Sequence, residues 1–292
     1  MPRLEGLRKK ITSTEQLHSV VKTMKAMAAV NIRQYETAVA SLQDYYRTIE
    51  LGLQTVLHRG IQSGLESEPM QSSRLGGVVL GSDQGMCGQF NEQIVTHTLR
   101  ELKNRRENER GSVLFAIGHR VVSPLKAARK TVEGDLALPS SIHGVTGRVQ
   151  QLIDVIEKWR LQKGIHEVVL FYNQYSDSAY HPTSQRLLPL DTAWIDRLKN
   201  RQWPTRCIPV FSMEPGKLFS HLLRQYFFVS LYRAFAESMA SENASRLRAM
   251  QAAEKSIQDR RDELDMQFHR LRQSAITEQL LDVVIGYEAL QK

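Results

Sequence analysis

The sequence is poor in cysteine and has no long apolar run. Its two cysteines, Cys87 and Cys207, lie far apart in the chain, which argues against a disulfide framework and indicates a reducing compartment. No apolar stretch approaches the roughly 18 residues that a membrane-spanning helix needs. The first residues, Met1 to Glu5, contain no apolar signal core, so we expect no secretory or organelle-targeting segment.

Motifs for catalysis and metal binding are also missing from the sequence. There is no G-x-x-x-x-G-K-[ST] segment, and the nine histidines form no H-x-x-x-H pair. A C-x-x-C motif is likewise absent, which argues against a zinc site. The carboxylates recur at spacings typical of solvated helix faces. We therefore expect no catalytic residue, no cofactor and no metal in this chain.

Glycine and proline are absent from a long C-terminal stretch, Lys217 to Ile285. Strong helix formers dominate it, and one continuous helix of this length would measure roughly 100 Å. A compact globule of this chain length is only on the order of 50 Å across. The sequence therefore predicts a helix that is too long to fit within its own domain. Such a helix must protrude and pack against another helix or another protein.

A second stretch without glycine or proline, Leu7 to Leu51, follows a heptad pattern. Residues at alternating steps of three and four form a seam that is apolar except at Thr14, His18 and Lys25. Such a seam, sustained over this length, predicts a coiled coil. Its members are Leu4, Leu7, Ile11, Thr14, His18, Val21, Lys25, Ala28, Ile32, Tyr35, Val39, Leu42, Tyr46, Ile49, Leu53 and Val56.

Between the two helices the composition changes to that of an α/β domain. A linker over His58 to Gly76 precedes three apolar runs that predict buried strands, and helical segments lie between or beside them. This alternation predicts a parallel sheet. The predicted strands are 78–80, 113–117 and 168–172, and the predicted helices are 89–106, 119–130 and 145–163. The proline-containing segment from Tyr175 to Pro215 predicts loop and edge strands.

The predicted architecture is a long antiparallel coiled coil of the two terminal helices with an inserted Rossmann-like parallel-sheet domain. Its segments are an N-terminal helix (1–57), the α/β domain with its linker (58–215) and a C-terminal helix (216–292). The C-terminal helix should outrun its partner by roughly 25 residues, or about 35–40 Å. This overhang, from about Arg261, retains apolar residues such as Leu264 and Leu280, which predicts another protein around its end.

Two other classes of function stay open on residues alone. Gly81 to Gly88 follows a predicted strand and precedes a helix, as a nucleotide-binding turn would, although its spacing is G-x-x-x-G-x-x-G. A Rossmann-type enzyme with helical appendages is therefore one alternative. The net charge of +8 permits a nucleic-acid-binding coiled coil, but the basic residues form no concentrated stripe, and solvated helix faces explain them as well.

Both helical ends resemble a known family. Ser19 to Ala29 (SVVKTMKAMAA) and Ser241 to Met250 (SENASRLRAM) are similar to the N- and C-terminal helices of the gamma subunit of rotary F-type ATP synthases. Arg272 to Leu290 (RQSAITEQLLDVVIGYEAL) resembles that family's C-terminal signature, and 82–88 (SDQGMCG) resembles its S-D-R-G-L-C-G turn. Gln84, Gln279 and Tyr287 depart from the usual residues, which indicates a divergent, bacterial-type member.

The resemblance implies a non-catalytic central stalk that transmits torque between a membrane c-ring and a catalytic ring of alpha and beta subunits. It implies ATP synthesis coupled to proton or sodium transport, with epsilon as a further partner and no nucleic acid. It places the protein at the cytoplasmic face of the bacterial plasma membrane through the complex.

The resemblance also implies site residues. Arg246, Arg272, Gln273 and Thr277 should face mobile loops of the catalytic subunits, with Met24 on the opposite side of the shaft. Lys22 and Lys25 would meet acidic loops of beta. Phe211 and Met213 should contact the c-ring and epsilon at the foot.

Overall fold

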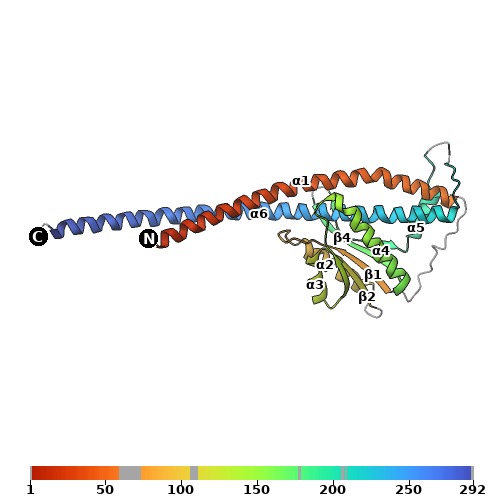
Figure 1. The fold of residues 1–292 in the computed structure, drawn as a ribbon, viewed down its shortest axis with the longest axis horizontal. Coiled ribbons are helices and arrows are strands. Elements are labelled where there is room, and N and C mark those ends of the chain that lie inside the picture. Colours follow the sequence, from red (N-terminus) through yellow and green to blue (C-terminus); the bar gives the residue numbers. More distant parts are fainter. Residues whose placement is uncertain are drawn as a thin grey trace. The chain divides into compact units, whose positions relative to one another are not determined.

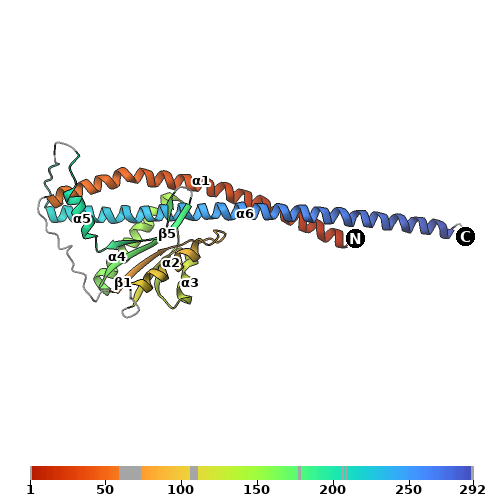
Figure 2. The same ribbon diagram turned by 180° about the vertical axis from the view of Figure 1, so that it is seen from behind.

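The structure is a computed structural model of the chain, shown in Figures 1 and 2. It describes residues 2–58, 74–105, 111–176, 179–204, 207 and 209–290, with only the backbone described at 2–3 and 286–290. The chain forms two compact units. The two-helix unit comprises Met1–Ala28 and Arg246–Lys292, and the α/β unit comprises Ala29–Ser245. This division cuts both long helices, whereas the sequence-based boundaries at 57 and 215 follow the helix ends and stay predictions.

The two long helices predicted from the scarcity of glycine and proline are confirmed. Helix α1 spans Pro2–His58, and helix α6 spans Pro215–Leu290. Both are continuous because their interiors hold strong helix formers, and the glycines at 6 and 52 of α1 do not interrupt it. Most of the predicted linker, residues 59–73, lies outside the described residues.

Within each unit, α1 and α6 run antiparallel and side by side (Figures 1 and 2). In the α/β unit, Asn31 Nδ2 donates to Asn243 Oδ1 at 3.4 Å, and Tyr45 OH donates to Gln225 Oε1 at 3.1 Å. Residue numbers therefore increase along α1 in the direction in which they decrease along α6. Most of the predicted seam is buried or half-buried, including Val21, Ala28, Ile32, Tyr35, Ile49, Leu53 and Val56.

The α/β unit contains one five-stranded sheet in the order β3-β2-β1-β4-β5. Strands β1 (Arg74–Leu80), β2 (Ser112–Ile117), β3 (Thr131–Leu136) and β4 (Ile165–Ser176) are parallel, and β5 (Ala179–Leu188) is antiparallel to β4. Val78 lies opposite Phe115 on one side and Leu170 on the other. The sheet is therefore mixed rather than wholly parallel, because the very short step from β4 to β5 permits only an antiparallel hairpin.

Helices cover both faces of this sheet. Helix α4 (Val145–Lys163) and the adjoining part of α6 pack on one face, where Phe235 and Trp159 are among the fully buried side chains. Helix α2 (Phe90–Asn104) and helix α3 (Val122–Ala127) pack on the other. A third apolar cluster joins the end of α1, the start of α6 and α5 (Thr192–Asn200). This sandwich fixes one face of α6 against the sheet within the α/β unit.

Several of these elements differ from their predicted bounds. The helix expected over 119–130 is a 3-10 turn, His119–Val121, followed by α3, and it ends before β3 begins. Strand β3 was not predicted because it is an edge strand whose side chains alternate between exposed and half-buried. In the segment expected to be loop and edge strands, β5 is an edge strand that contains Pro182, as predicted. Helix α5 was missed, although Asp191 caps it by accepting from Ala193 N.

Buried tyrosines predict an alkaline limit to the stability of the α/β unit. Burial raises the pKa of Tyr172, and the nearby Glu237 carboxylate raises it further. In the unfolded chain the phenol ionises near pH 10, whereas in the folded chain it keeps its proton. The buried phenol therefore contributes its full stabilisation below about pH 10. Above about pH 10 the free energy of unfolding falls, by at most about 1.4 kcal/mol per pH unit for each such phenol.

We expect Tyr172→Phe to reduce the pH dependence of the unfolding free energy, measured by urea titration between pH 8 and 11. Tyr45→Phe, at an exposed phenol, is the matched control. Equal slopes for wild type and Tyr172→Phe would contradict this account of the buried phenol.

Candidate functional site

The described part of the chain offers no cluster for a metal ion. None of its described residues forms a group of three or more His, Cys, Asp or Glu side chains that could hold a metal ion. None of its described helices is long and apolar enough to cross a membrane. The candidate functional regions are the turn after β1, a hollow on α2, the two-helix unit and the predicted foot.

Two polar residues of the turn after β1, Ser82 and Asp83, make internal contacts. The Asp83 carboxylate accepts from the backbone N–H of His119 at 2.9 Å and of Leu138 at 2.8 Å. Asn91 Oδ1 accepts from Ser82 N at 2.9 Å, and Asn91 Nδ2 donates to Ser82 Oγ at 2.8 Å. These bonds tie the carboxyl ends of β1, β2 and β3 together.

Helix α6 closes the other side of this turn. Ser245 Oγ donates to the Cys87 carbonyl at 2.6 Å, and the Tyr180 hydroxyl lies 3.0 Å from Ser245 Oγ. A Cβ at Gly88, which has φ of +57°, would lie only 3.4 Å from Ser245 Oγ. The backbone that would hold a phosphate in a nucleotide-binding turn instead packs on α6. This arrangement does not favour the nucleotide-enzyme alternative. Cys87 is buried, and Asn91 Nδ2 donates to its Sγ at 3.5 Å.

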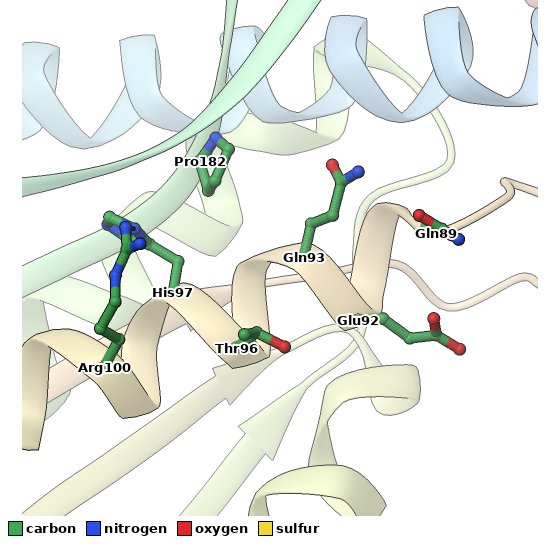
Figure 3. Close-up of a pocket in the computed structure, with 7 residues that line it drawn as sticks. All are labelled: Gln89, Glu92, Gln93, Thr96, His97, Arg100 and Pro182. Atoms are coloured by element: carbon green, nitrogen blue, oxygen red, sulfur yellow. Dashed lines mark hydrogen bonds between the residues drawn. The ribbon is translucent and has the colours of Figure 1, made fainter.

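A shallow hollow lies along α2 beside Pro182 of β5 (Figure 3). Arg100 Nη2 and His97 Nδ1 are 3.4 Å apart, and burial lowers the pKa of His97. The residues that line this hollow include no nucleophile paired with a base. The lining residues are Gln89, Glu92, Gln93, Thr96, His97, Arg100 and Pro182.

The structure separates the predicted ring-facing residues into two groups. Arg272, Gln273 and Thr277 are exposed and lie within two turns of α6, where Thr277 Oγ1 donates to the Gln273 carbonyl at 3.0 Å. Arg246 lies roughly 39 Å from Arg272 along the helix, at a rise of about 1.5 Å per residue. Its side chain is only 8% exposed, and Met24 is half-buried. Their predicted contacts with partner subunits stay predictions.

Helix α6 is exposed on every side over residues 276–285. From Ile276 to Ile285 each side chain is exposed, and apolar residues predominate, with Leu280 at 61% and Val283 at 69%. Singly exposed apolar residues are normal, but a contiguous set of this size marks an interaction surface. The apolar members are Ile276, Leu280, Leu281, Val283, Val284 and Ile285.

The exposed end begins later than predicted. Leu264, expected to lack a partner within the chain, is only 3% exposed. It lies in the two-helix unit beside a hollow that Lys9, Lys10 and Ser13 also line. Pairing with α1 therefore continues past Arg261, because α1 is helical from Pro2 onward. Leu271 is still half-buried, and full exposure begins at Ile276.

The predicted foot residues lie just before α6. Phe211 is half-buried and packs against the cluster formed by α1, α5 and α6, whereas Met213 is 48% exposed. The neighbouring Val210, which sequence reasoning did not select, is also exposed. Val210 belongs to the short apolar run Ile208-Pro209-Val210-Phe211, which was the only signal for it in the sequence.

One polar contact of the two-helix unit was missed by sequence reasoning. Lys25 Nζ donates to Glu254 Oε2 at 2.5 Å, and His18 Nε2 lies 3.9 Å from Glu254 Oε1. The same three-and-four spacing applied to the C-terminal helix, as it was to α1, would have identified Glu254 as a seam position.

The chain matches the model of the family described as ATP synthase over residues 3–290, so it belongs to that family. Its curated relatives are gamma chains. A protein named ATP synthase gamma chain from Clostridium botulinum (strain Kyoto / Type A2) is 28% identical over 291 residues, covering 98% of each chain. One of the same name from Glaesserella parasuis serovar 5 is 27% identical over 302 residues, covering 99% of this chain and 100% of the relative.

Solved structures share the fold. The rotor of the Euglena gracilis mitochondrial ATP synthase in rotational state 1 matches with a TM-score of 0.63 at 16% identity, covering 94% of this chain and 99% of that chain. A chain from the OSCP/F1/c-ring structure of the same organism matches with a TM-score of 0.65 at 16% identity, covering 99% and 95%. The likeness extends over both long helices and the sheet, because nearly the whole chain is covered.

Proposed function

We propose that this protein is the central rotor stalk subunit of an F-type ATP synthase. It transmits torque between the c-ring of the membrane sector and the catalytic ring of alpha and beta subunits, in ATP synthesis coupled to proton or sodium transport. Its partners are the alpha, beta and epsilon subunits and the c-ring, with no nucleic acid. The observation that carries the proposal is the exposed apolar end of α6, residues 276–285, on a chain whose relatives are gamma chains.

The apolar end of α6 is suited to lie within a collar of partner subunits. Full burial of one such side chain contributes about 1.5–3 kcal/mol, so several of them supply substantial affinity for an apolar sleeve. Arg272 and Gln273 precede this end, Thr277 lies within it, and all three are exposed. They supply the polar contacts to the mobile loops of the catalytic subunits.

Met24 and Arg246 act at a second level of the shaft. Arg246 is buried, so it contributes to a partner contact by holding neighbouring side chains in place or by turning outward in the complex. Rotation of an asymmetric shaft gives each beta subunit a different contact free energy. That difference shifts the conformational equilibrium of each beta subunit in turn.

The proposed foot lies in the residues just before α6. Phe211 packs in an apolar cluster and fixes the segment. Met213 is exposed and is available to the c-ring or epsilon. A similar solved structure is the central stalk and c-ring of the Tetrahymena thermophila mitochondrial ATP synthase, which supports a c-ring partner for this protein.

The chain itself is non-catalytic in this proposal, because ATP chemistry belongs to the beta subunits. It needs no cofactor. It is a peripheral membrane protein at the cytoplasmic face of the bacterial plasma membrane, held there through the complex.

The test is purification of the tagged chain from source membranes washed at low ionic strength. We expect alpha, beta and epsilon subunits in fixed stoichiometry, together with ATPase activity that is absent from the isolated chain. Recovery of the chain alone, or ATPase activity in the isolated chain, would refute the rotor proposal. Nucleotide binding by the isolated chain would instead favour the Rossmann-type enzyme.

A further inference from the structure

In the two-helix unit, α1 and α6 pack through a heptad seam. From Leu247 to Leu271, the residues of α6 at alternating steps of three and four are buried or half-buried, whereas most of their neighbours are exposed. The surfaces beside the seam are therefore the part of the unit that a surrounding subunit can reach. The seam positions of α6 are Leu247, Met250, Glu254, Ile257, Arg261, Leu264, Phe268 and Leu271.

Positive charge is concentrated in the part of α1 that belongs to this unit. Residues 1–28 contain six basic and only two acidic side chains, an excess of four positive charges, which is half of the net charge of +8 of the whole chain. Residues 246–292 contain eight of each sign, so they do not neutralise this excess. The basic residues of the first segment are Arg3, Arg8, Lys9, Lys10, Lys22 and Lys25.

Lys25, which the family resemblance assigns to acidic loops of beta, already has a carboxylate within the unit. Its Nζ donates to Glu254 Oε2 at 2.5 Å, and this hydrogen bond lowers the pKa of Glu254. His18 Nε2 lies 3.9 Å from the other carboxylate oxygen. The Lys25 side chain is about one-third exposed, so an acidic partner would have to compete with Glu254 for it. Cations elsewhere on the unit are better placed to bind such a partner.

A hollow of about 340 Å³ between α1 and α6 is lined mainly by other cations. Leu264 is only 3% exposed and supplies its apolar part. None of the described residues that line it is acidic. Because its cations come from two helices, they do not appear as a stripe in the sequence. The polar lining residues are Lys9, Lys10, Ser13, Thr14 and Arg260.

The cations of this basic hollow remain available to a ligand. Lys9 Nζ lies 3.8 Å from Glu5 Oε1, and Arg260 Nη1 donates to Glu263 Oε2, but all four of these side chains are at least half exposed. Ion pairs between exposed side chains on one helix are weak, so a partner's carboxylate can replace them. Thr14 Oγ1 already donates to a backbone carbonyl of α1 at 2.8 Å, so we assign no ligand contact to it.

We propose that the basic hollow is a docking site for carboxylates on an acidic loop of the ring that surrounds the shaft. Charge complementarity identifies this occupant, because three cations surround an apolar side chain and no acid lines the hollow. Arg260 can bind one carboxylate through two N–H groups, and the lysines act as point charges. The inference rests on the proposed rotor function. It adds a level of contact roughly 21 Å from Arg246 and 18 Å from Arg272 along α6.

The experiment measures the affinity of the full-length chain for a purified alpha/beta ring at two salt concentrations. The test variant is Lys10→Glu/Arg260→Glu, which reverses one cation of the hollow on each helix. The matched control is Arg8→Glu/Lys255→Glu, which makes the same change in net charge at exposed positions that do not line the hollow. Melting curves should coincide with wild type, because all four positions are exposed.

We expect the test variant to weaken binding by about tenfold or more at about 0.1 M salt, because attractive charge pairs become repulsive. The control should weaken it by no more than about threefold. At about 1 M salt, where the Debye length is about 3 Å, the difference between the two variants should largely disappear. Equal weakening by both variants, or weakening that does not depend on salt, would overturn the proposal.

A second measurement needs no ring and therefore separates failure of this proposal from failure of the rotor proposal. A fluorophore is attached at Gln16→Cys, an exposed position one turn beyond Ser13, in a Cys207→Ser background. A short glutamate-rich peptide should shift its emission saturably, and Lys10→Glu/Arg260→Glu should abolish the shift. No response to the peptide, or a response only to inorganic phosphate, would contradict docking of an acidic loop.

Discussion

Deletion of residues 273–292 should leave the α/β unit folded and should weaken assembly with the catalytic ring by at least about tenfold. The described side chains from Ile276 to Ile285 are exposed in the isolated chain, so their removal costs the folded chain little. In the complex, loss of even one buried side chain of this size would remove about 1.5–3 kcal/mol, and 1.4 kcal/mol is a factor of ten in affinity. Assembly is measured by titrating the chain into a purified alpha/beta ring and following binding and coupled ATP hydrolysis.

Substitutions within the exposed end separate its apolar character from its length. Leu280→Ser/Leu281→Ser/Val284→Ser should weaken assembly nearly as much as the deletion. Glu278→Ser/Asp282→Ser, on the same turns of α6, is the matched control and should have little effect. Assembly and coupling that are unchanged by the deletion would eliminate the role proposed for Gln273, Thr277 and the apolar end.

Replacement of Phe235 by alanine should destabilise the α/β unit by about 3–5 kcal/mol, the usual cost of truncating a fully buried aromatic side chain. Phe235 belongs to the cluster that joins α6 to the sheet and to α4. For a unit of this size each kcal/mol lowers the melting temperature by about 2–4 °C. A decrease of roughly 6–20 °C is therefore expected in a thermal melt followed by circular dichroism.

Ile276→Ala is the control for this truncation, because Ile276 lies on the same helix but is exposed. It should change the unfolding free energy by no more than about 0.5 kcal/mol. If Phe235→Ala had the same melting temperature as the wild type, this cluster would not hold α6 to the sheet.

The long helices were predictable because their signals are local and repeated. The absence of glycine and proline over 217–285 and the heptad seam of α1 act at every turn. The central strands β1, β2 and β4 were partly predictable because burial on both faces makes their sequences continuously apolar. Edge strand β3 lacks that signal, since it contains the charged residues Glu133 and Asp135 at exposed positions. Helix α5 is short and lies in a proline-containing segment, so its Asp191 cap was not distinguished from a turn.

The candidate site was less predictable than the fold. Residues alone indicated an apolar overhang, and they placed its start too early because the reach of α1 along α6 depends on how the helices pair. Leu264 is buried for that reason. The roles of Arg272, Gln273 and Thr277 came from the family resemblance, and exposure alone does not identify a partner. The contact between Lys25 and Glu254 is non-local, so it needed the seams of both helices to be aligned.

The change from paired to unpaired helix along α6 has a mechanical consequence. From Leu247 to Leu271 the seam positions of the helix are buried or half-buried, and from Ile276 to Ile285 every side chain is exposed. A lone helix bends and twists under smaller loads than two helices packed together. Elastic deformation under load should therefore concentrate in residues 276–285, which should be more flexible than the paired part of the helix.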